Sequence, residues 1–391
     1  MKKIISGCLL IISMLCPHHI AAQHLNPSNI RISLLTAAPG EELYSAWGHN
    51  GVRVKIDSLD YDVVYNYGTF DFNQPNFYSN FARGLMLYRL SRTSYDNFIA
   101  EYMYENRCVR EQVFALDSAQ TISVALFLEN NYLPENRNYR YHFLLDNCAT
   151  RIRDLMLQTF DGIELPQSES APTYRDLIHL YLKDHPWGRF GIDIALGLPT
   201  DQKTDAFEQM FLPDYMFHTF ARMLYHGQPI VQETKDIFVP AQPAILPPGP
   251  ITPTVVCVIV SVLALVLSFK YKGFGLRCKV FAKIFDFALF FSVGLVGLLV
   301  TFLWFFTDHT TTQNNLNIIW ALPTHLVMAF FLFSKRRSNF TRYYFLAIAI
   351  LAMLLLVSWG FLPQRLNPSL IPLVIAIELR AFSIFRRKLI F

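Results

Sequence analysis

The sequence predicts an α+β domain that is exported from the cytoplasm, followed by an α-helical membrane domain of about five transmembrane helices. Three observations predict it. The N-terminus has the pattern of a secretory signal, the middle of the chain places short β-rich runs before helical periods, and five apolar stretches fill the last third. With 391 residues, 52% of them hydrophobic and 16% charged, the chain is long enough for two units and too apolar for one soluble domain.

A signal peptide is expected over residues 1–22. Lys2 and Lys3 form a positive start, a short apolar run follows, and Ala21 and Ala22 supply the small side chains of a cleavage site. This pattern is typical of a secretory signal and is too short for a spanning helix. The rest of the chain is therefore expected to begin outside the cytoplasm.

Residues 23–236 have the sequence pattern of a globular α+β domain. Runs of β-forming residues, separated by turn residues, come before segments with amphipathic helical periodicity. The expected strands cover residues 30–35, 51–56, 63–67 and 108–116, and the expected helices cover residues 118–131, 150–160 and 206–225.

Proline then changes the character of the chain. Six prolines fall between residues 240 and 253, so residues 237–250 are expected to form a stiff, extended linker. The membrane domain is expected over residues 251–391, because a spanning helix needs about 20 apolar residues and most of the apolar stretches reach that length. The stretches are approximately 251–269, 284–306, 316–334, 343–362 and 370–385.

The loops between these stretches predict the orientation. Basic residues gather between the first and second stretches, between the third and fourth, and after the fifth, whereas the alternate loops hold only Arg365. Basic loops stay in the cytoplasm. The chain is therefore expected in the bacterial inner membrane, with residues 23–236 on the periplasmic side, in agreement with the signal peptide.

Two histidines lie close to the membrane stretches. His309 follows the second stretch and is either an interfacial or a functional residue, and His325 lies inside the third. Ionisable groups at membrane depth are costly and often functional. His325 is expected either to line a lipid-facing groove or to bond to a neighbouring helix.

Cys148 is the candidate nucleophile. It opens an amphipathic helical period, and either Asp146 or Asn147 can cap that helix. Free N–H groups and the positive end of the helix dipole favour the thiolate, which is the nucleophilic form. The same N–H groups can stabilise an oxyanion.

His49 is the candidate base. It follows Trp47 and Gly48 at a turn that leads into an expected strand, where an imidazole can face Cys148 across a groove. It would take the thiol proton and later protonate a leaving group. His142, six residues before Cys148, is the competing base.

A third polar side chain is expected to orient the imidazole of His49. Asn66, on the following strand, is the first candidate. Tyr67 and Asp71 are the alternatives, because the sequence pattern does not fix which face of the strand points toward His49.

A Cys108–Cys148 disulfide is the alternative to a free nucleophile. Exported proteins hold disulfides, and these two are the cysteines that remain outside the signal and the membrane stretches. Cys108 otherwise has the surroundings of a packing thiol. No metal is expected, because no Cys and His residues occur at the spacing of metal ligands, and no cofactor is expected, because no glycine-rich phosphate-binding loop occurs. No stripe of basic residues indicates nucleic-acid binding.

The order of histidine first and cysteine later, with the cysteine opening a helix after asparagine, resembles the circularly permuted papain-like fold of NlpC-type hydrolases and lecithin:retinol acyltransferase. A longer pattern resembles the Lnb family, the lipoprotein N-acyltransferases of Bacteroidota. The resemblance covers nearly the whole chain, and the segments that carry it are Ser45-Ala46-Trp47-Gly48-His49, Asn66-Tyr67-Gly68-Thr69-Phe70-Asp71-Phe72, Asp146-Asn147-Cys148-Ala149-Thr150-Arg151 and Phe211-Leu212-Pro213-Asp214.

The resemblance implies an acyltransferase with Cys148 as nucleophile and His49 as base. It would take an acyl chain from a membrane phospholipid as a thioester and pass it to the α-amino group of a diacylated lipoprotein. Two other functions compete with this reading. A membrane-anchored NlpC-type peptidase, amidase or phospholipase would use the same pair of residues, and a sensor or scaffold would use neither.

Overall fold

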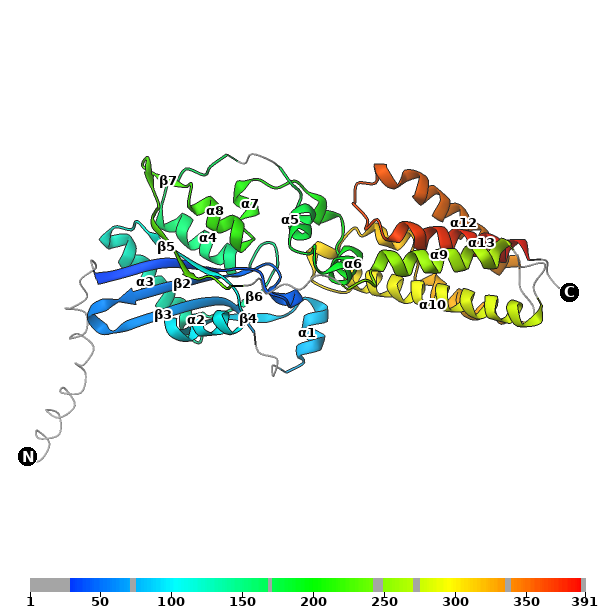
Figure 1. The fold of residues 1–391 in the computed structure, drawn as a ribbon, viewed down its shortest axis with the longest axis horizontal. Coiled ribbons are helices and arrows are strands. Elements are labelled where there is room, and N and C mark those ends of the chain that lie inside the picture. Colours follow the sequence, from blue (N-terminus) through cyan, green and yellow to red (C-terminus); the bar gives the residue numbers. More distant parts are fainter. Residues whose placement is uncertain are drawn as a thin grey trace, which may run out of the picture.

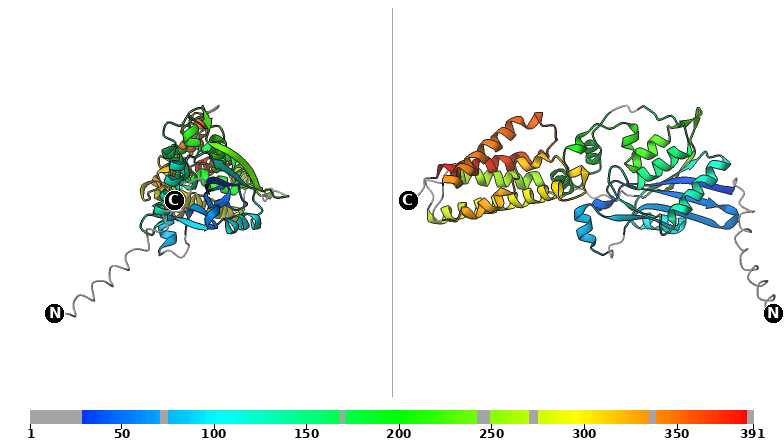
Figure 2. Two further views of the ribbon diagram at one scale, coloured as in Figure 1. Left: turned by 90° about the vertical axis from the view of Figure 1, so that its left-hand side faces the viewer. Right: turned by 180° about the vertical axis from the view of Figure 1, so that it is seen from behind.

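The computed structural model describes residues 29–70, 75–167, 171–241, 249–269, 275–334 and 339–387. An α+β domain is followed by a helical bundle, as predicted, and the two lie end to end along the long axis (Figure 1). The views of Figure 2 show the same arrangement from behind and along the axis. The predicted signal peptide, residues 1–22, lies outside the described residues.

A seven-stranded antiparallel sheet forms the frame of the first domain, with the strand order β6-β4-β3-β2-β1-β5-β9. A separate hairpin joins two short strands. The strands are β1 (Ile30–Ala37), β2 (His49–Ile56), β3 (Tyr61–Thr69), β4 (Leu87–Ser94), β5 (Val109–Phe114), β6 (Asn138–Arg140), β7 (Leu224–Tyr225), β8 (Gln228–Pro229) and β9 (Val231–Phe238).

Helices cover both faces of this sheet. Alternate side chains of β1 point to opposite faces, so Ile32 and Leu34 join the larger core against α4 and α8, whereas Leu35 and Ala37 pack near α2. The helices of this domain are α1 (Phe77–Arg83), α2 (Tyr95–Tyr104), α3 (Ser118–Tyr132), α4 (Cys148–Thr159), α5 (Tyr174–Leu180), α6 (Pro186–Ala195), α7 (Ala206–Gln209) and α8 (Pro213–Phe220).

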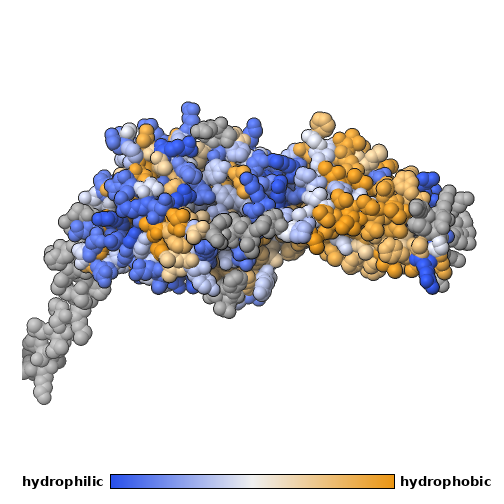
Figure 3. Space-filling model, in the orientation of Figure 1, coloured by the Kyte–Doolittle hydropathy of each residue, from blue (hydrophilic) through white to orange (hydrophobic). Residues whose placement is uncertain are grey.

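The second part is a helical bundle with a broad apolar surface (Figure 3). Two segments, Leu276–Phe305 and Asn339–Phe361, are long and apolar enough to cross a membrane, and Pro253–Phe269 and Leu316–Phe331 are shorter apolar helices. Five spans remain a prediction. The helices are α9 (Pro253–Phe269), α10 (Leu276–Phe305), α11 (Thr324–Phe331), α12 (Asn339–Ser358) and α13 (Leu370–Arg386).

Polar side chains inside the bundle bond to one another. Asp286 of α10 accepts hydrogen bonds from Arg380 of α13 at 2.6 Å and from Arg387 at 2.8 Å. A buried charge needs such a partner. His325 lies 2.7 Å from the Tyr344 hydroxyl on α12, which fits the expected bond to a neighbouring helix.

One end of the sheet faces the bundle. Ala37 pairs with His49 there, at the end of β1 and the start of β2, and Leu87 pairs with Arg140 at the start of β4. The Arg140 guanidinium lies 3.4 Å from the carboxylate of Asp308, in the loop that follows α10. Side chains at this end of the sheet therefore lie close to the membrane domain.

The sequence located the central strands and the helices at residues 118–131 and 150–160, which correspond to β1, β2, β3, β5, α3 and α4. The single helix expected over 206–225 was wrong. Pro213 starts a new helix there because its ring prevents the preceding one from continuing. The linker expected from residue 237 starts later, since β9 continues to Phe238.

Candidate active site

Cys148 is the first residue of α4, so its side chain lies at the positive end of the helix dipole. Asn147 caps the helix, as one of the two expected alternatives. Its side-chain oxygen accepts hydrogen bonds from the N–H groups of Ala149 at 2.8 Å and Thr150 at 2.9 Å. Its amide group donates to the carbonyl oxygen of Phe211 at 2.9 Å, which anchors the helix start to the loop before α8.

His49 begins β2 directly after a tight turn. Gly48 has a φ of +79°, and a Cβ atom at that position would lie 2.8 Å from the carbonyl oxygen of Ala37. The turn therefore requires glycine. The pairing of His49 with Ala37 on β1 then fixes the imidazole at the end of the sheet.

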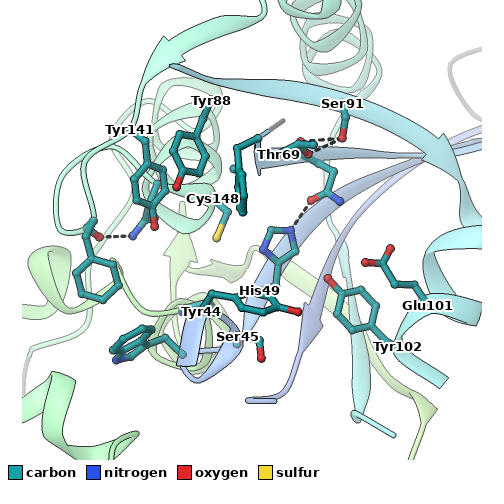
Figure 4. Close-up of a pocket in the computed structure, with 18 of the residues that line it drawn as sticks. Tyr44, Ser45, His49, Thr69, Tyr88, Ser91, Glu101, Tyr102, Tyr141 and Cys148 are labelled. Carbon is teal, nitrogen blue, oxygen red and sulfur yellow. Dashed lines mark hydrogen bonds between the residues drawn. The ribbon is translucent and has the colours of Figure 1, made fainter. Parts of the chain in front are cut away.

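Asn66 on β3 accepts a short hydrogen bond from Nε2 of His49. The other ring nitrogen, Nδ1, then faces the sulfur of Cys148 (Figure 4). Gly68, two residues after Asn66, has a φ of +88°, and its Cβ position would lie 3.6 Å from Cβ of Cys148. Glycine thus lets β3 pass close to the cysteine. The structure brings Cys148, His49 and Asn66 together, and their catalytic roles remain a prediction.

The electrostatics favour an ion pair between the thiolate and the imidazolium. Burial alone would raise the pKa of Cys148, but the charge and hydrogen bond of His49, with the N–H groups of Asn50 and Ala149, hold that pKa below the usual thiol value. Burial alone would lower the pKa of His49, but the Cys148 thiolate and the bond to Asn66 hold it above the usual value. Such a pair is a ready nucleophile at neutral pH.

These residues line a cleft of about 460 Å³. Aromatic side chains, including Tyr88 and Tyr141, lie on the side of Cys148, whereas Glu101 lies beyond His49 (Figure 4). Arg107 also lines the cleft. The site therefore has an apolar side and a polar side, with the sulfur and the imidazole between them.

The competing candidates take other roles. The ring of His142 bonds to Thr310 at 2.8 Å, in the loop after α10, and does not line the cleft. The Tyr67 hydroxyl donates to Asn131 at 2.6 Å and does not orient His49. Asp71 lies outside the described residues.

Cys108 and Cys148 are both free thiols, so the alternative disulfide is not formed. Burial raises the pKa of Cys108 above its usual value, which keeps it protonated and unreactive at neutral pH. In the described parts of the chain, no group of three or more His, Cys, Asp or Glu side chains is placed to hold a metal ion.

Sequence reasoning missed part of the cleft. Tyr88, on the unpredicted strand β4, and Tyr141, after β6, come together only through the pairing of these strands. No local signal marks such a contact. The motif residues Phe211, Leu212 and Pro213 do line the cleft, whereas Asp214 bonds to Arg110 at 3.0 Å.

Two family models match this chain. Residues 18–180 match the Lnb N-terminal periplasmic domain, and residues 246–389 match the Lnb transmembrane domain. Neither the curated proteins nor the solved structures contain a match. Because both Lnb domains are present, and in that order, the chain belongs to the Lnb family and is a membrane protein with a periplasmic N-terminal domain.

Proposed function

We propose that this protein is a lipoprotein N-acyltransferase of the inner membrane. It moves an acyl chain from a membrane phospholipid, through a thioester on Cys148, to the α-amino group of a diacylglyceryl-cysteine lipoprotein. The observation that carries the proposal is the pairing of Cys148 with His49, which lowers the thiol pKa and raises the imidazole pKa, in a partly aromatic cleft at the end of the sheet that faces the membrane domain.

In the first half-reaction, the Cys148 thiolate attacks the carbonyl carbon of an ester bond in the phospholipid. The C–S bond forms, and the carbonyl electron pair moves to oxygen, where the backbone N–H of Cys148 at the start of α4 stabilises it. The bond from carbon to the glycerol oxygen then breaks. The imidazolium of His49 gives its proton to that oxygen, so a lysophospholipid leaves and the acyl chain stays as a thioester.

In the second half-reaction, the lipoprotein amine attacks the thioester. His49, now neutral, takes the proton that the amine loses as the C–N bond forms. The C–S bond breaks and the thiolate returns, paired again with imidazolium. Asn66 holds the imidazole in one orientation through both steps and is a positioning residue.

The membrane domain suits this reaction. Both substrates are lipids, and a domain fixed to a bundle at the membrane surface meets them without extracting either one. We assign the periplasmic domain a permuted papain-like arrangement, supported by the order of His49 before Cys148 and by the position of Cys148 at a helix start on a sheet. We assign five spans to the bundle on the basis of its apolar stretches and basic loops.

The direct test is the N-terminal acylation state of a reporter lipoprotein, measured by mass spectrometry in cells that make no other N-acyltransferase. Wild type is expected to add one acyl chain, Cys148→Ala to add none, and Cys108→Ala to behave as wild type, because Cys108 is a free thiol outside the cleft.

Other outcomes separate the alternatives. Release of free fatty acid and lysophospholipid without a change in the lipoprotein would identify a phospholipase. Cleaved peptidoglycan peptides would identify a peptidase or amidase. A lipoprotein mass that is the same with wild type and with Cys148→Ala contradicts the proposal.

A further inference from the structure

Helix α1 is attached to the membrane domain. The N–H of Asp308, in the loop after α10, donates to the carbonyl oxygen of Arg83 at 2.9 Å, and Nε2 of His309 lies 3.1 Å from the carbonyl oxygen of Phe81. Gly84 closes the helix with a φ of +73°, and a Cβ atom there would lie 3.1 Å from the backbone of His309. Because α10 is one of the two long apolar helices found among the described residues, α1 lies at the membrane border.

The outer face of α1 is aromatic. Tyr78 is 82% exposed and Phe81 is 57% exposed. Aromatic side chains of this kind concentrate where a protein meets the headgroup region of a bilayer. The position of α1 beside the end of α10 provides such a boundary.

A continuous line of rings connects this helix with the catalytic cleft. Phe81 stacks on Phe77 with ring centres 6.4 Å apart, and Phe77 stacks on Phe70 at 6.1 Å. Phe70 lies 5.3 Å from Tyr88, and Tyr88 stacks on Tyr141 at 4.2 Å. Phe70, Tyr88 and Tyr141 are themselves walls of the cleft that holds Cys148.

We propose that this line of rings, from Phe81 to Tyr141, is the path along which the donor's acyl chain lies between the membrane and Cys148. The assignment rests on the proposed function and adds the location and chemistry of the donor site: a long apolar chain that enters at α1. The five aromatic rings make dispersion contacts with a methylene chain. Contact between the chain and the rings also removes apolar surface from water, which is favourable.

The arrangement of side chains in the cleft supports an acyl chain on the side of Tyr88 and Tyr141. Tyr88 and Tyr141 lie on the side of Cys148, and Glu101 and Tyr102 lie beyond His49 (Figure 4). A scissile ester at the sulfur would therefore place its hydrocarbon among the rings and its glycerol oxygen toward His49. That is the direction in which the leaving group needs a proton.

The test compares donors of two chain lengths, with the purified full-length protein in lipid nanodiscs and a diacylated lipopeptide as acceptor. Phe77→Ala and Phe81→Ala are expected to lower kcat/KM for a phospholipid with 16-carbon chains by about tenfold each, because each removes a ring from an apolar binding surface. A donor with six-carbon chains should react as with wild type, since a short chain does not extend to α1.

Phe127→Ala is the matched control, because Phe127 on α3 is 42% exposed and does not line the cleft. Alkylation of Cys148 by iodoacetamide should proceed at the wild-type rate in all three variants, which shows that the catalytic pair is intact. The deciding quantity is kcat/KM for the 16-carbon donor divided by kcat/KM for the six-carbon donor. If this ratio is the same in Phe77→Ala, Phe81→Ala and wild type, the proposed acyl-chain path is wrong.

A second measurement does not need turnover. A phospholipid with a photoreactive diazirine at the end of its acyl chain is expected to label α1 in the Cys148→Ala protein. Labelling confined to the helices of the bundle overturns the path even if the protein transfers no acyl group. Absence of transfer by wild type from both donors, with α1 labelled, would instead contradict the proposed function alone.

Discussion

At the scale of single residues, the reactive state depends on two opposed pKa shifts. Burial disfavours charge on both Cys148 and His49, yet each stabilises the charged form of the other, and Asn66 adds a hydrogen bond to the imidazole. The pKa of the thiol is therefore held below its usual value and that of the imidazole above its usual value, and both shifts favour the thiolate–imidazolium pair.

The rate of Cys148 alkylation by iodoacetamide should therefore remain high at neutral pH and fall only when acid protonates the thiolate. His49→Ala removes the main partner, so burial then dominates and the midpoint of the pH–rate profile is expected to move upward, above the usual thiol pKa. Cys108→Ala serves as the background control. A His49→Ala profile that coincides with the wild-type profile would show that His49 does not activate the thiol.

At the scale of elements, the start of α4 holds the nucleophile in place. Asn147 satisfies two N–H groups of the helix and bonds to the carbonyl oxygens of Phe143 and Phe211. The residue is buried, so water cannot replace these bonds when its side chain is removed.

Asn147→Ala is accordingly expected to lower the free energy of unfolding by about 1 to 2 kcal/mol, and to slow the alkylation of Cys148 because the helix start loosens. Asp146→Ala is the matched control. Asp146 pairs with Arg151 at a partly exposed position, where a salt bridge contributes about 1 kcal/mol or less. Chemical denaturation monitored by circular dichroism measures the free energy of unfolding of both variants. An equal decrease in the two variants would contradict the capping role of Asn147.

Some elements of the site could be predicted from the sequence, and others could not. The period-two runs around Ile32 and Val54, and the capped helix at Cys148, are local patterns, so they located the strands and the helix that carry the site. The face of β3 that holds Asn66 required the register with β2, because the pattern of that strand is apolar on both sides. The line of rings required the packing of distant segments.

At the scale of the whole molecule, a buried polar network joins the two domains. Asp193 of α6 accepts hydrogen bonds from Arg175 at 2.9 Å and from Asn367, in the loop before α13, at 2.8 Å. Asn317, in the loop after α10, donates to the Asp193 carbonyl at 3.0 Å. This network and the contacts of α1 hold the cleft at a fixed place beside the bundle.

Asp193→Ala should weaken this attachment, because it leaves the Arg175 charge buried with less compensation, a change that typically costs about 3 to 5 kcal/mol. Asp184→Ala, at an exposed position before α6, is the control. The expected result is a lower thermal transition in detergent and faster proteolysis between the domains for Asp193→Ala only. Equal behaviour of the two variants would contradict the role of the network.

The network also predicts a pH dependence. Burial would raise the pKa of Asp193, but His179 and Arg175 hold it below its usual value. The stability that ionised Asp193 contributes is therefore complete above the unfolded-state pKa of about 3.9. It is lost only as the pH falls through the lower folded-state pKa. The domains should stay joined at pH 5, and separation at that pH would contradict the assignment.

The central claim is an acyl thioester on Cys148 that is passed to an amine. The most direct measurement is the intact mass of the purified protein after exposure to phospholipid, followed by addition of a diacylated lipopeptide. We predict one acyl group on Cys148 that hydroxylamine removes, and its transfer to the lipopeptide as an amide that hydroxylamine leaves intact. An acyl group that never appears on Cys148, or that leaves only as free fatty acid when the lipopeptide is present, would contradict the account.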